Sequence, residues 1–440
     1  MNKLVVIVVA LIMVFAGLIA YHIYNEPADQ HFYLHMHILN STAIGNFSIG
    51  SYHYDIKYPW FNTTMAGYNN YTIQFQNYIA YNNISNKTAH LYLVKNTTFT
   101  FSPLPLWYVP INITNTNDTA TPKNFQAMVK INWSAYSKYL LPSLSNVRFY
   151  NSTSFTPSHE LAAWMENNNT LQARSSIVWV NMSGTVITGK SSVKIYMLFG
   201  PSTENFGKHW GEAPQLSATY GQYDNGAKVF SFYDNFAGTT LSSRWTTGGV
   251  YSGSVDNGLT LTSPSVSGGI YASYSATSGI LETYWEQTAA QTFKVIFLNQ
   301  LSIGTGWYAD GYNSKQLAGL TTDQNLLEKQ VGGSTTVLTT GLTNTQLSTY
   351  YIVGLEWNGA NGLLNETLNY SSISSATDTT YTSMVGISLM TWGAATNIIK
   401  WVRVRAYPPS GTMPASQFLS PALSNILNSS PIHQGQIYLE

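Results

Sequence analysis

The sequence contains no cysteine, which excludes a disulfide framework, a thiolate metal site and a catalytic thiol. Charged residues are also scarce: they make up 9% of the 440 residues, against about 25% in ordinary soluble domains. The 20 basic and 20 acidic side chains cancel, so the chain offers no basic field to phosphates, and we expect no nucleic-acid partner. No Gly-x-Ser-x-Gly elbow, His-Glu-x-x-His motif, phosphate loop or dinucleotide fingerprint is present.

The composition favours strands over helices. Tyrosine and tryptophan number 31 and 12, and threonine is frequent, and all three types are enriched in strands. After the first thirty residues no segment keeps a helical period. Short alternating runs recur instead, separated by Gly, Asn, Ser and Pro: AHLYLV, SIVWVNM, SVKIYMLF, GLTLTS, TFKVIFLN, YIVGLEW and KWVRVRAY. The pattern predicts an all-β chain built from tandem β-sandwich domains.

The N-terminus carries a long apolar run. Residues 4–21 hold no charge, follow Lys3, and precede Glu26 and Asp29. The run is long enough to cross a bilayer as a helix, and its flanking charges leave the remainder of the chain outside. We expect residues 1–24 to form a signal anchor or, alternatively, a cleaved signal peptide. Both readings predict an extracellular protein, and the first anchors it by its N-terminus to a cell surface or viral envelope.

Glycosylation motifs are unusually dense in the first half of the chain. Of sixteen Asn-x-Ser/Thr sequons, thirteen lie at or before Asn181, and residues 182–364 contain none. Drift toward Asn and Thr explains neither the excess nor the gap, so we expect N-glycosylation of the first half. The sixteen asparagines are Asn40, Asn46, Asn62, Asn70, Asn83, Asn86, Asn96, Asn112, Asn117, Asn132, Asn151, Asn168, Asn181, Asn365, Asn369 and Asn428.

Two proline-containing stretches without alternation, 102–122 and 200–226, divide the chain. The division predicts five parts after the N-terminal segment: a glycosylated β-domain (30–118), a β-sandwich domain (123–200), a linker (201–226), a jelly roll (227–410) and a polar C-terminal tail (411–440).

The middle part contains four distinctive pieces: Val147-Arg148-Phe149, Trp164 with Glu166, Val178-Trp179-Val180 and the closing run from Ile195 to Gly200. In these pieces it resembles a domain of unknown function from archaeal and bacterial surface proteins. Such domains are typically followed by a concanavalin A-like lectin/glucanase domain of the laminin-G type. Residues 230–245 and 398–414 resemble the first and last strands of that jelly roll, which implies that 230–236 lies beside 399–407.

One predicted strand carries two carboxylates. In ILETYWEQT (280–288), alternation puts Glu282, Tyr284 and Glu286 on one face, as in two-carboxylate glycosidases. The outer glutamates match the Glu-x-Asp-x-Glu motif of laminarinase-type glucanases, but Tyr284 replaces the central Asp, which in that family tunes the nucleophile. We therefore expect strand residues rather than a catalytic pair, and a degenerate glycoside hydrolase is the enzymatic alternative.

A lectin role requires aromatic rings and polar groups on an accessible face. We expect glycan contacts from Trp285, Trp307, Tyr308, Asp310 and Tyr312. The resemblance also implies a structural calcium ion at Asp234, although the sequence has no Asp-rich calcium loop. No other cofactor is expected.

Three histidines share one face of the predicted strand HFYLHMHIL. His35-x-His37, with His31 on the same face, could bind Zn²⁺ or Cu²⁺. No third acidic or thiolate ligand lies nearby in the sequence, so we expect an exposed, titrating strand edge.

These observations predict a surface protein whose jelly roll recognises glycans or host or cell-surface proteins in adhesion or attachment, without catalysis. The alternative is a structural filament or envelope subunit, and hence a homo-oligomer, in which one strand completes a neighbour's open sheet. The segment 31–39 and the tail 415–440 are the candidate donor strands.

Overall fold

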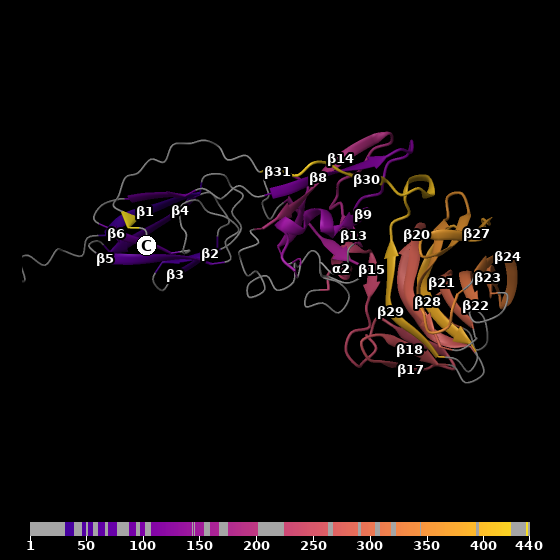
Figure 1. Cartoon of the computed structure of the whole chain (residues 1–440). Helices are drawn as coiled ribbons and strands as arrows, with labels where there is room; N and C mark the ends of the chain where they lie inside the picture. The colour runs from indigo at the N-terminus through magenta and orange to yellow at the C-terminus, as the bar shows by residue number, and fades with distance from the viewer. Residues whose placement is uncertain are drawn as a thin grey trace, which may run out of the picture. The chain divides into compact units, whose positions relative to one another are not determined.

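The chain forms two compact units in a computed structural model (Figure 1). The first comprises Met1–Pro105, Ser154–Pro157 and Ser424–Glu440, and the second comprises Leu106–Thr153 and Ser158–Leu423. The structure describes residues 31–38, 46–49, 52–55, 60–66, 69–76, 88–93, 97–101, 107–142, 144, 146–153, 159–166, 175–200, 224–262, 267–288, 292–303, 309–317, 323–343, 345–392, 396–423 and 437–438. Within these ranges no helix is long and apolar enough to cross a membrane, and the predicted span over 4–21 lies outside them.

The first unit contains two sheets in its described residues. One has the order β4 (Trp60–Ala66), β1 (His31–Ile38) and β7 (Thr97–Phe101). The other has the order β3 (Tyr52–Asp55), β2 (Asn46–Ile49), β5 (Asn69–Gln76), β6 (Thr88–Leu93) and β32 (Ile437–Tyr438). The prediction that the histidine strand β1 is a sheet edge is wrong, because β1 pairs antiparallel with β4 and parallel with β7.

The second unit begins with a β-sandwich. Its larger sheet, here called the β8 sheet, has the order β11 (Glu160–Leu161), β10 (Val147–Tyr150), β14 (Ser191–Phe199), β8 (Trp107–Asn115) and β30 (Ala415–Phe418), with β31 (Ala422–Leu423) also paired to β8. Its smaller sheet, the β13 sheet, has the order β12 (Ala163–Met165), β13 (Ser175–Asn181) and β9 (Gln126–Asn132), and the 3-10 helix η1 (Trp133–Tyr139) follows β9.

Two predicted boundaries differ from the structure around β8. The sequence placed residues 107–115 in the first domain, but β8 pairs with β14 along its whole length and buries alternate side chains in the sandwich core. The predicted polar tail is also partly paired, since β30 and β31 lie along the other side of β8 (Figure 1). Local patterns did not show either pairing, because both join segments far apart in the sequence. The remaining domain divisions stay predictions.

The second unit continues as two larger antiparallel sheets. The β29 sheet has the order β17 (Ser252–Val255), β18 (Leu259–Thr262), β29 (Thr396–Arg405), β20 (Ser278–Gln287), β25 (Tyr350–Asn358), β26 (Leu363–Leu368) and β27 (Ser371–Thr377), and β15 (Phe232–Asp234) also pairs with β29. The β28 sheet has the order β16 (Thr246–Gly249), β19 (Gly268–Ala276), β28 (Met384–Trp392), β21 (Thr292–Leu298), β22 (Gly311–Leu317), β23 (Asp323–Val331) and β24 (Ser334–Thr343).

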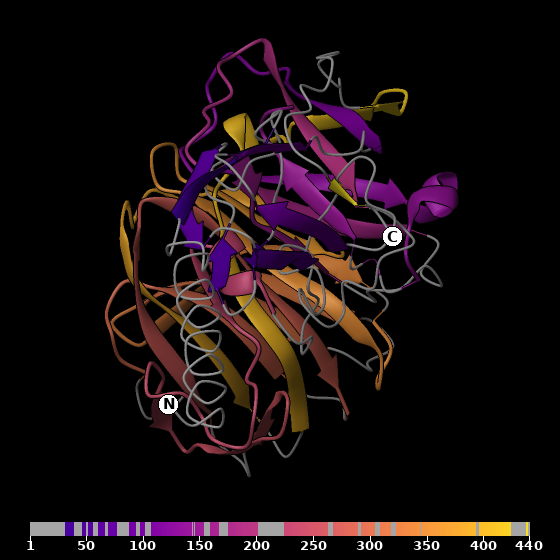
Figure 2. The same cartoon turned by 90° about the vertical axis from the view of Figure 1, so that its left-hand side faces the viewer.

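These sheets confirm the all-β prediction and one specific pairing. The first strand of the jelly roll, β15, lies antiparallel to the last long strand, β29, with Phe232 opposite Val404. In Figure 2 the gold strands near the end of the chain accordingly run among salmon strands from the start of the jelly roll. The short helices α2 (Gly226–Val229) and η4 (Pro409–Gly411) precede β15 and follow β29.

The described residues of the second unit form several apolar cores, of which three position the candidate site. One lies inside the first sandwich and one lies between the β29 and β28 sheets. A third core joins the outer face of the β13 sheet to the outer face of the β29 sheet, and is built mainly from Trp164, Trp179, Phe230, Tyr233, Ile352 and Trp401. This junction explains why β20 is buried on both faces, although an exposed antiparallel sheet would bury only one.

Candidate functional site

Glu282, the first candidate acid, is neutralised by two arginines. Its side chain is fully buried on β20, where Oε2 accepts a hydrogen bond from Arg403 Nε at 2.7 Å. Its Oε1 accepts from Arg405 Nε and Nη2 at 3.0 and 2.9 Å. Burial alone would raise the pKa of Glu282, but the two guanidinium groups more than offset it and lower the pKa below the ordinary value. A carboxylate held in this way neither donates a proton nor attacks a sugar.

Arg403 connects this carboxylate to the first sandwich. Its Nη2 lies 3.0 Å from Glu166 Oε2 and donates to the Tyr370 hydroxyl at 2.8 Å, while Tyr370 itself donates to Glu166. Four rings surround the guanidinium carbon, with centroids 4.5–5.4 Å away: Trp401, Trp179, Phe230 and Trp164. Burial lowers the pKa of Arg403, but Tyr370, Glu282 and Glu166 more than offset this effect. The net pKa is raised above the ordinary value, so the side chain stays charged. The cluster is therefore part of the junction between the sandwiches.

Glu286, the second candidate, lies half-buried near the end of β20, opposite Tyr350 in the register. Burial and then the Glu286 carboxylate raise the pKa of Tyr350, so that phenol stays neutral. With Glu282 held between arginines, the two glutamates do not form an acid–nucleophile pair.

Two of the predicted glycan-binding aromatics are core residues. Trp285 is 1% exposed, stacks on Phe293 at 5.2 Å, and donates its indole N–H to Asn397 at 2.8 Å. Tyr312 is fully buried and donates to the Asp378 carboxylate at 2.6 Å. The prediction was wrong for both, because the odd-numbered residues near the end of β20 and the even-numbered residues of β22 face the jelly-roll interior.

Of the remaining predicted glycan contacts, the structure describes Asp310 alone. Trp307 and Tyr308 lie outside the described residues, whereas Asp310 is half-buried just before β22. The Asp310 Oδ1 atom and both amide atoms of Asn313 are buried without a hydrogen-bond partner among the described residues. Because Asn313 is fully buried, a ligand does not reach it in this conformation.

Asp234, the predicted calcium ligand, uses its carboxylate for other bonds. Its Oδ1 accepts from the Phe236 main-chain N–H at 2.7 Å, and its Oδ2 accepts from the Trp245 indole N–H at 2.9 Å. Across the described ranges no group of three or more His, Asp or Glu side chains is placed to hold a metal ion. Asp234 instead fixes the turn after β15 and orients a core tryptophan.

The described sequons differ in accessibility. Asn62, Asn70, Asn132, Asn151 and Asn369 are exposed, while Asn112, Asn117, Asn181 and Asn365 are half-buried. Asn46 lies in β2, and the other six fall outside the described residues: Asn40, Asn83, Asn86, Asn96, Asn168 and Asn428. Glycosylation at all sixteen stays a prediction.

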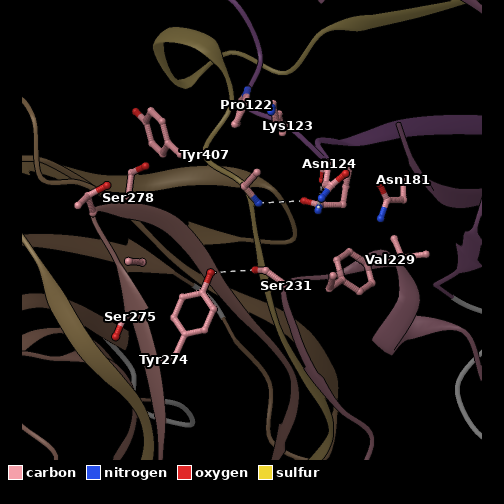
Figure 3. A pocket seen from close by; sticks show the side chains of 15 residues that line it. Pro122, Lys123, Asn124, Asn181, Val229, Ser231, Tyr274, Ser275, Ser278 and Tyr407 are labelled. Atoms are coloured by element: carbon pink, nitrogen blue, oxygen red, sulfur yellow. Dashed lines mark hydrogen bonds between the residues drawn. The ribbon is translucent and has the colours of Figure 1, made fainter. Parts of the chain in front are cut away.

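A pocket of about 440 Å³ opens at one end of the junction. Figure 3 shows Asn124 and Asn181, from the first sandwich, on one side, and Tyr274, Ser278 and Tyr407, from the jelly roll, on the other. Its volume falls within the roughly 300–1,000 Å³ typical of small-molecule sites. The described residues that line it are Pro122, Lys123, Asn124, Gln126, Asn181, Val229, Phe230, Ser231, Tyr274, Ser275, Ala276, Thr277, Ser278, Ala406 and Tyr407.

Hydrogen bonds fix the back wall of this junction pocket. Gln126 accepts from the Ala406 N–H at 2.9 Å and donates to the Asn124 carbonyl at 2.7 Å, which ties the first sandwich to the end of β29 (Figure 3). The Ser231 hydroxyl donates to the Val404 carbonyl at 2.9 Å and lies 2.8 Å from the Tyr274 hydroxyl, so Tyr274 is the donor in that pair. The wall is therefore formed before any ligand arrives.

The front of the pocket offers neutral polar groups. The Asn124 amide and the hydroxyls of Ser275, Thr277 and Ser278 have no hydrogen-bond partner among the described residues. Among the described residues of the lining, Lys123 is the one that carries a charge. Burial raises the pKa of Tyr274, and burial with Glu356 raises that of Tyr407 to about 12, so both phenols stay neutral. Rings beside amides and hydroxyls suit an uncharged ligand with several hydroxyl groups.

The sequence predicted no ligand contact from the residues of this pocket, and it singled out only Asn181, as a glycosylation site. They come from the start of β9, the end of β13, the α2–β15 segment, the β19–β20 turn and the end of β29, and the sequence gives no local sign that these meet. A signal for the Glu282 cluster was present, because Arg403 and Arg405 alternate with valines in the last predicted strand.

Comparisons with known proteins identify no family. No family model matches the chain. A stretch of 137 residues is 34% identical to "Uncharacterized protein 562" of Sulfolobus islandicus rod-shaped virus 1, covering 31% of this chain but only 23% of that protein's length.

Solved structures similar to part of the chain include the carbohydrate-binding module CBM66 from Bacillus subtilis, with 17% sequence identity and a TM-score of 0.32. The match covers 37% of this chain and 96% of that module. A Bacillus subtilis protein of unknown function with a galectin-like fold has 14% identity, coverages of 40% and 96%, and a TM-score of 0.34. The laminarinase from Rhodothermus marinus has 12% identity, coverages of 40% and 96%, and a TM-score of 0.32. At these TM-scores the likenesses carry no argument, and the fold assignment rests on the strand pairings.

Proposed function

We propose that the chain is a non-catalytic recognition protein of an exterior surface, which binds a neutral glycan in the junction pocket and acts in adhesion or attachment. The observation that carries the proposal is the pocket itself. Its described lining combines a preformed wall, three aromatic rings and unbonded amide and hydroxyl groups with one charged side chain. Sugars need such neutral polar partners beside apolar ring faces.

The bonds of Glu282 to two arginines support a protein that does not catalyse a reaction. The one pair of glutamates that matches a glucanase motif is broken, since Arg403 and Arg405 hold Glu282 as a buried carboxylate. The exterior setting is supported by the apolar run at residues 4–21 and by the excess of sequons. The partial identity to a protein of a rod-shaped virus supports a virus as the source.

A tryptophan placed at Ser275 is expected to block ligand binding. Ser275 is exposed on β19 and lines the pocket, so Ser275→Trp fills the space without disturbing the core. The control is Ser273→Trp on the same strand, because Ser273 is also exposed but is not part of the lining. Affinity for neutral oligosaccharides would be measured by calorimetry on the full chain and both variants.

The expected result is a binding loss of about tenfold or more, or at least 1.4 kcal/mol, in Ser275→Trp, with Ser273→Trp close to wild type. Equal affinities in the wild type and both variants would show that the oligosaccharide binds outside the junction pocket. Binding by none of them to any neutral sugar would contradict the proposed function.

A further inference from the structure

The tail of the chain supplies the edge strand of the first sandwich. The C-terminal strap (residues 415–423) leaves the jelly roll after β29 and pairs antiparallel with β8. Phe418 lies opposite Ile111, Leu423 lies opposite Trp107, and the Leu419 N–H donates to the Pro110 carbonyl at 2.9 Å. Without the strap, β8 would expose an unpaired edge over most of its length, which is a template for another strand.

The strap contributes little to the apolar core. None of residues 415–423 is buried, and only Phe418 packs against the sandwich core, with its ring 6.1 Å from that of Tyr136. Main-chain hydrogen bonds therefore provide most of the attachment. Elements with few buried contacts and a solvent-exposed ladder open at low cost, well before global unfolding.

The segment before the strap is built as a turn under strain. It contains Pro408, Pro409 and Pro414, and Ser410 adopts φ 52° and ψ 29° within η4. A left-handed backbone is unfavourable for serine, so opening this turn relieves local strain. The prolines limit the conformations that the released segment gains, and they favour an extended connection.

We propose that the strap of one copy pairs with β8 of a second copy, so that the chain assembles by strand exchange. A second copy's residues 415–423 fit the β8 edge by construction, since they reproduce every pairing seen within one chain. The exchange keeps the same contacts and relaxes the Ser410 turn. It does not depend on the junction pocket, because no strap residue lines it.

Single cysteines test this exchange, since the chain has none of its own. Asn112 and Gln417 face each other across β8 and β30, and both lie on the solvent side of the sheet. Full-length Asn112→Cys is mixed with a mass-tagged Gln417→Cys chain and oxidised. A disulfide heterodimer forms only if the strap of one copy lies on β8 of the other, and its yield should rise with protein concentration.

The matched control mixes Asn112→Cys with Lys194→Cys. Lys194 is the partner of Asn112 on the other side of β8, but its strand β14 is held between β8 and β10 and does not exchange. A chain carrying both Asn112→Cys and Gln417→Cys should close its own disulfide in dilute solution, which verifies the register. Ser410→Gly, which relaxes the closed turn, should lower the heterodimer yield. Equal heterodimer yields from the Gln417→Cys mixture and the Lys194→Cys mixture would overturn the proposal. It would also be overturned if the double variant closes its own disulfide but the Gln417→Cys mixture gives no heterodimer.

Discussion

Replacing Arg403 by methionine is expected to lower the free energy of unfolding of the second unit by about 3–5 kcal/mol, the loss typical when one partner of a buried ion pair is removed. Methionine keeps an unbranched side chain among the surrounding rings, but it leaves Glu282 with Arg405 alone and removes the charged donor to Glu166. The cost arises because the Glu282 carboxylate stays fully buried.

The measurement is urea unfolding followed by tryptophan fluorescence, since Trp164, Trp179 and Trp401 surround Arg403 and report on its site. Lys190→Met is the control: Lys190 and Asp118 also form an ion pair, at 3.5 Å, but their side chains are 64% and 89% exposed. An exposed pair contributes little, so no measurable change is expected. Similar small losses in both variants would contradict a structural role for the Arg403 cluster.

Replacing Glu366 by glutamine is expected to remove much of the pH dependence of jelly-roll stability. Glu366 projects from β26 into the jelly-roll interior and is fully buried. It accepts hydrogen bonds from Ser314 at 2.6 Å, Gln316 at 2.6 Å and Ser374 at 2.9 Å. No cation pairs with it among the described residues, and burial raises its pKa from 4.5 to about 7.

The direction of the effect follows from that raised pKa. Between pH 4.5 and 7 the folded state binds a proton at Glu366 that the unfolded state has released, so stability is full below pH 4.5 and falls as pH rises toward 7. The loss from this group is about 3 kcal/mol. Urea unfolding at several pH values should show this decline in the wild type and a flatter profile in Glu366→Gln. Parallel profiles would contradict an ionising Glu366 in the core.

The sequence predicted the strands well but not their partners. Strands β18, β21, β25 and β14 cover most of the runs GLTLTS, TFKVIFLN, YIVGLEW and SVKIYMLF, because alternation and β-branched or aromatic residues act locally. Membership of β8 in the second unit, and the return of residues 415–423 to it, depend on contacts between segments far apart in the sequence.

A second limit of the sequence-based prediction was that it did not show which face of a strand points into the core. The even-numbered positions in β20, including Glu282 and Glu286, were recognised as one face, but a period of two does not say which face meets the core. Both faces proved to be covered, by the jelly-roll interior and by the junction. For this reason Trp285 was predicted to contact a glycan, whereas the structure has it stacked on Phe293.

We propose that the protein recognises a neutral glycan without catalysing a reaction on it. The most direct test passes the full chain over immobilised neutral polysaccharides and follows retention and new reducing ends together, with and without EDTA. We expect retention without reducing ends and no effect of EDTA, since Asp234 already accepts two N–H donors. New reducing ends that disappear in Glu282→Gln would contradict it.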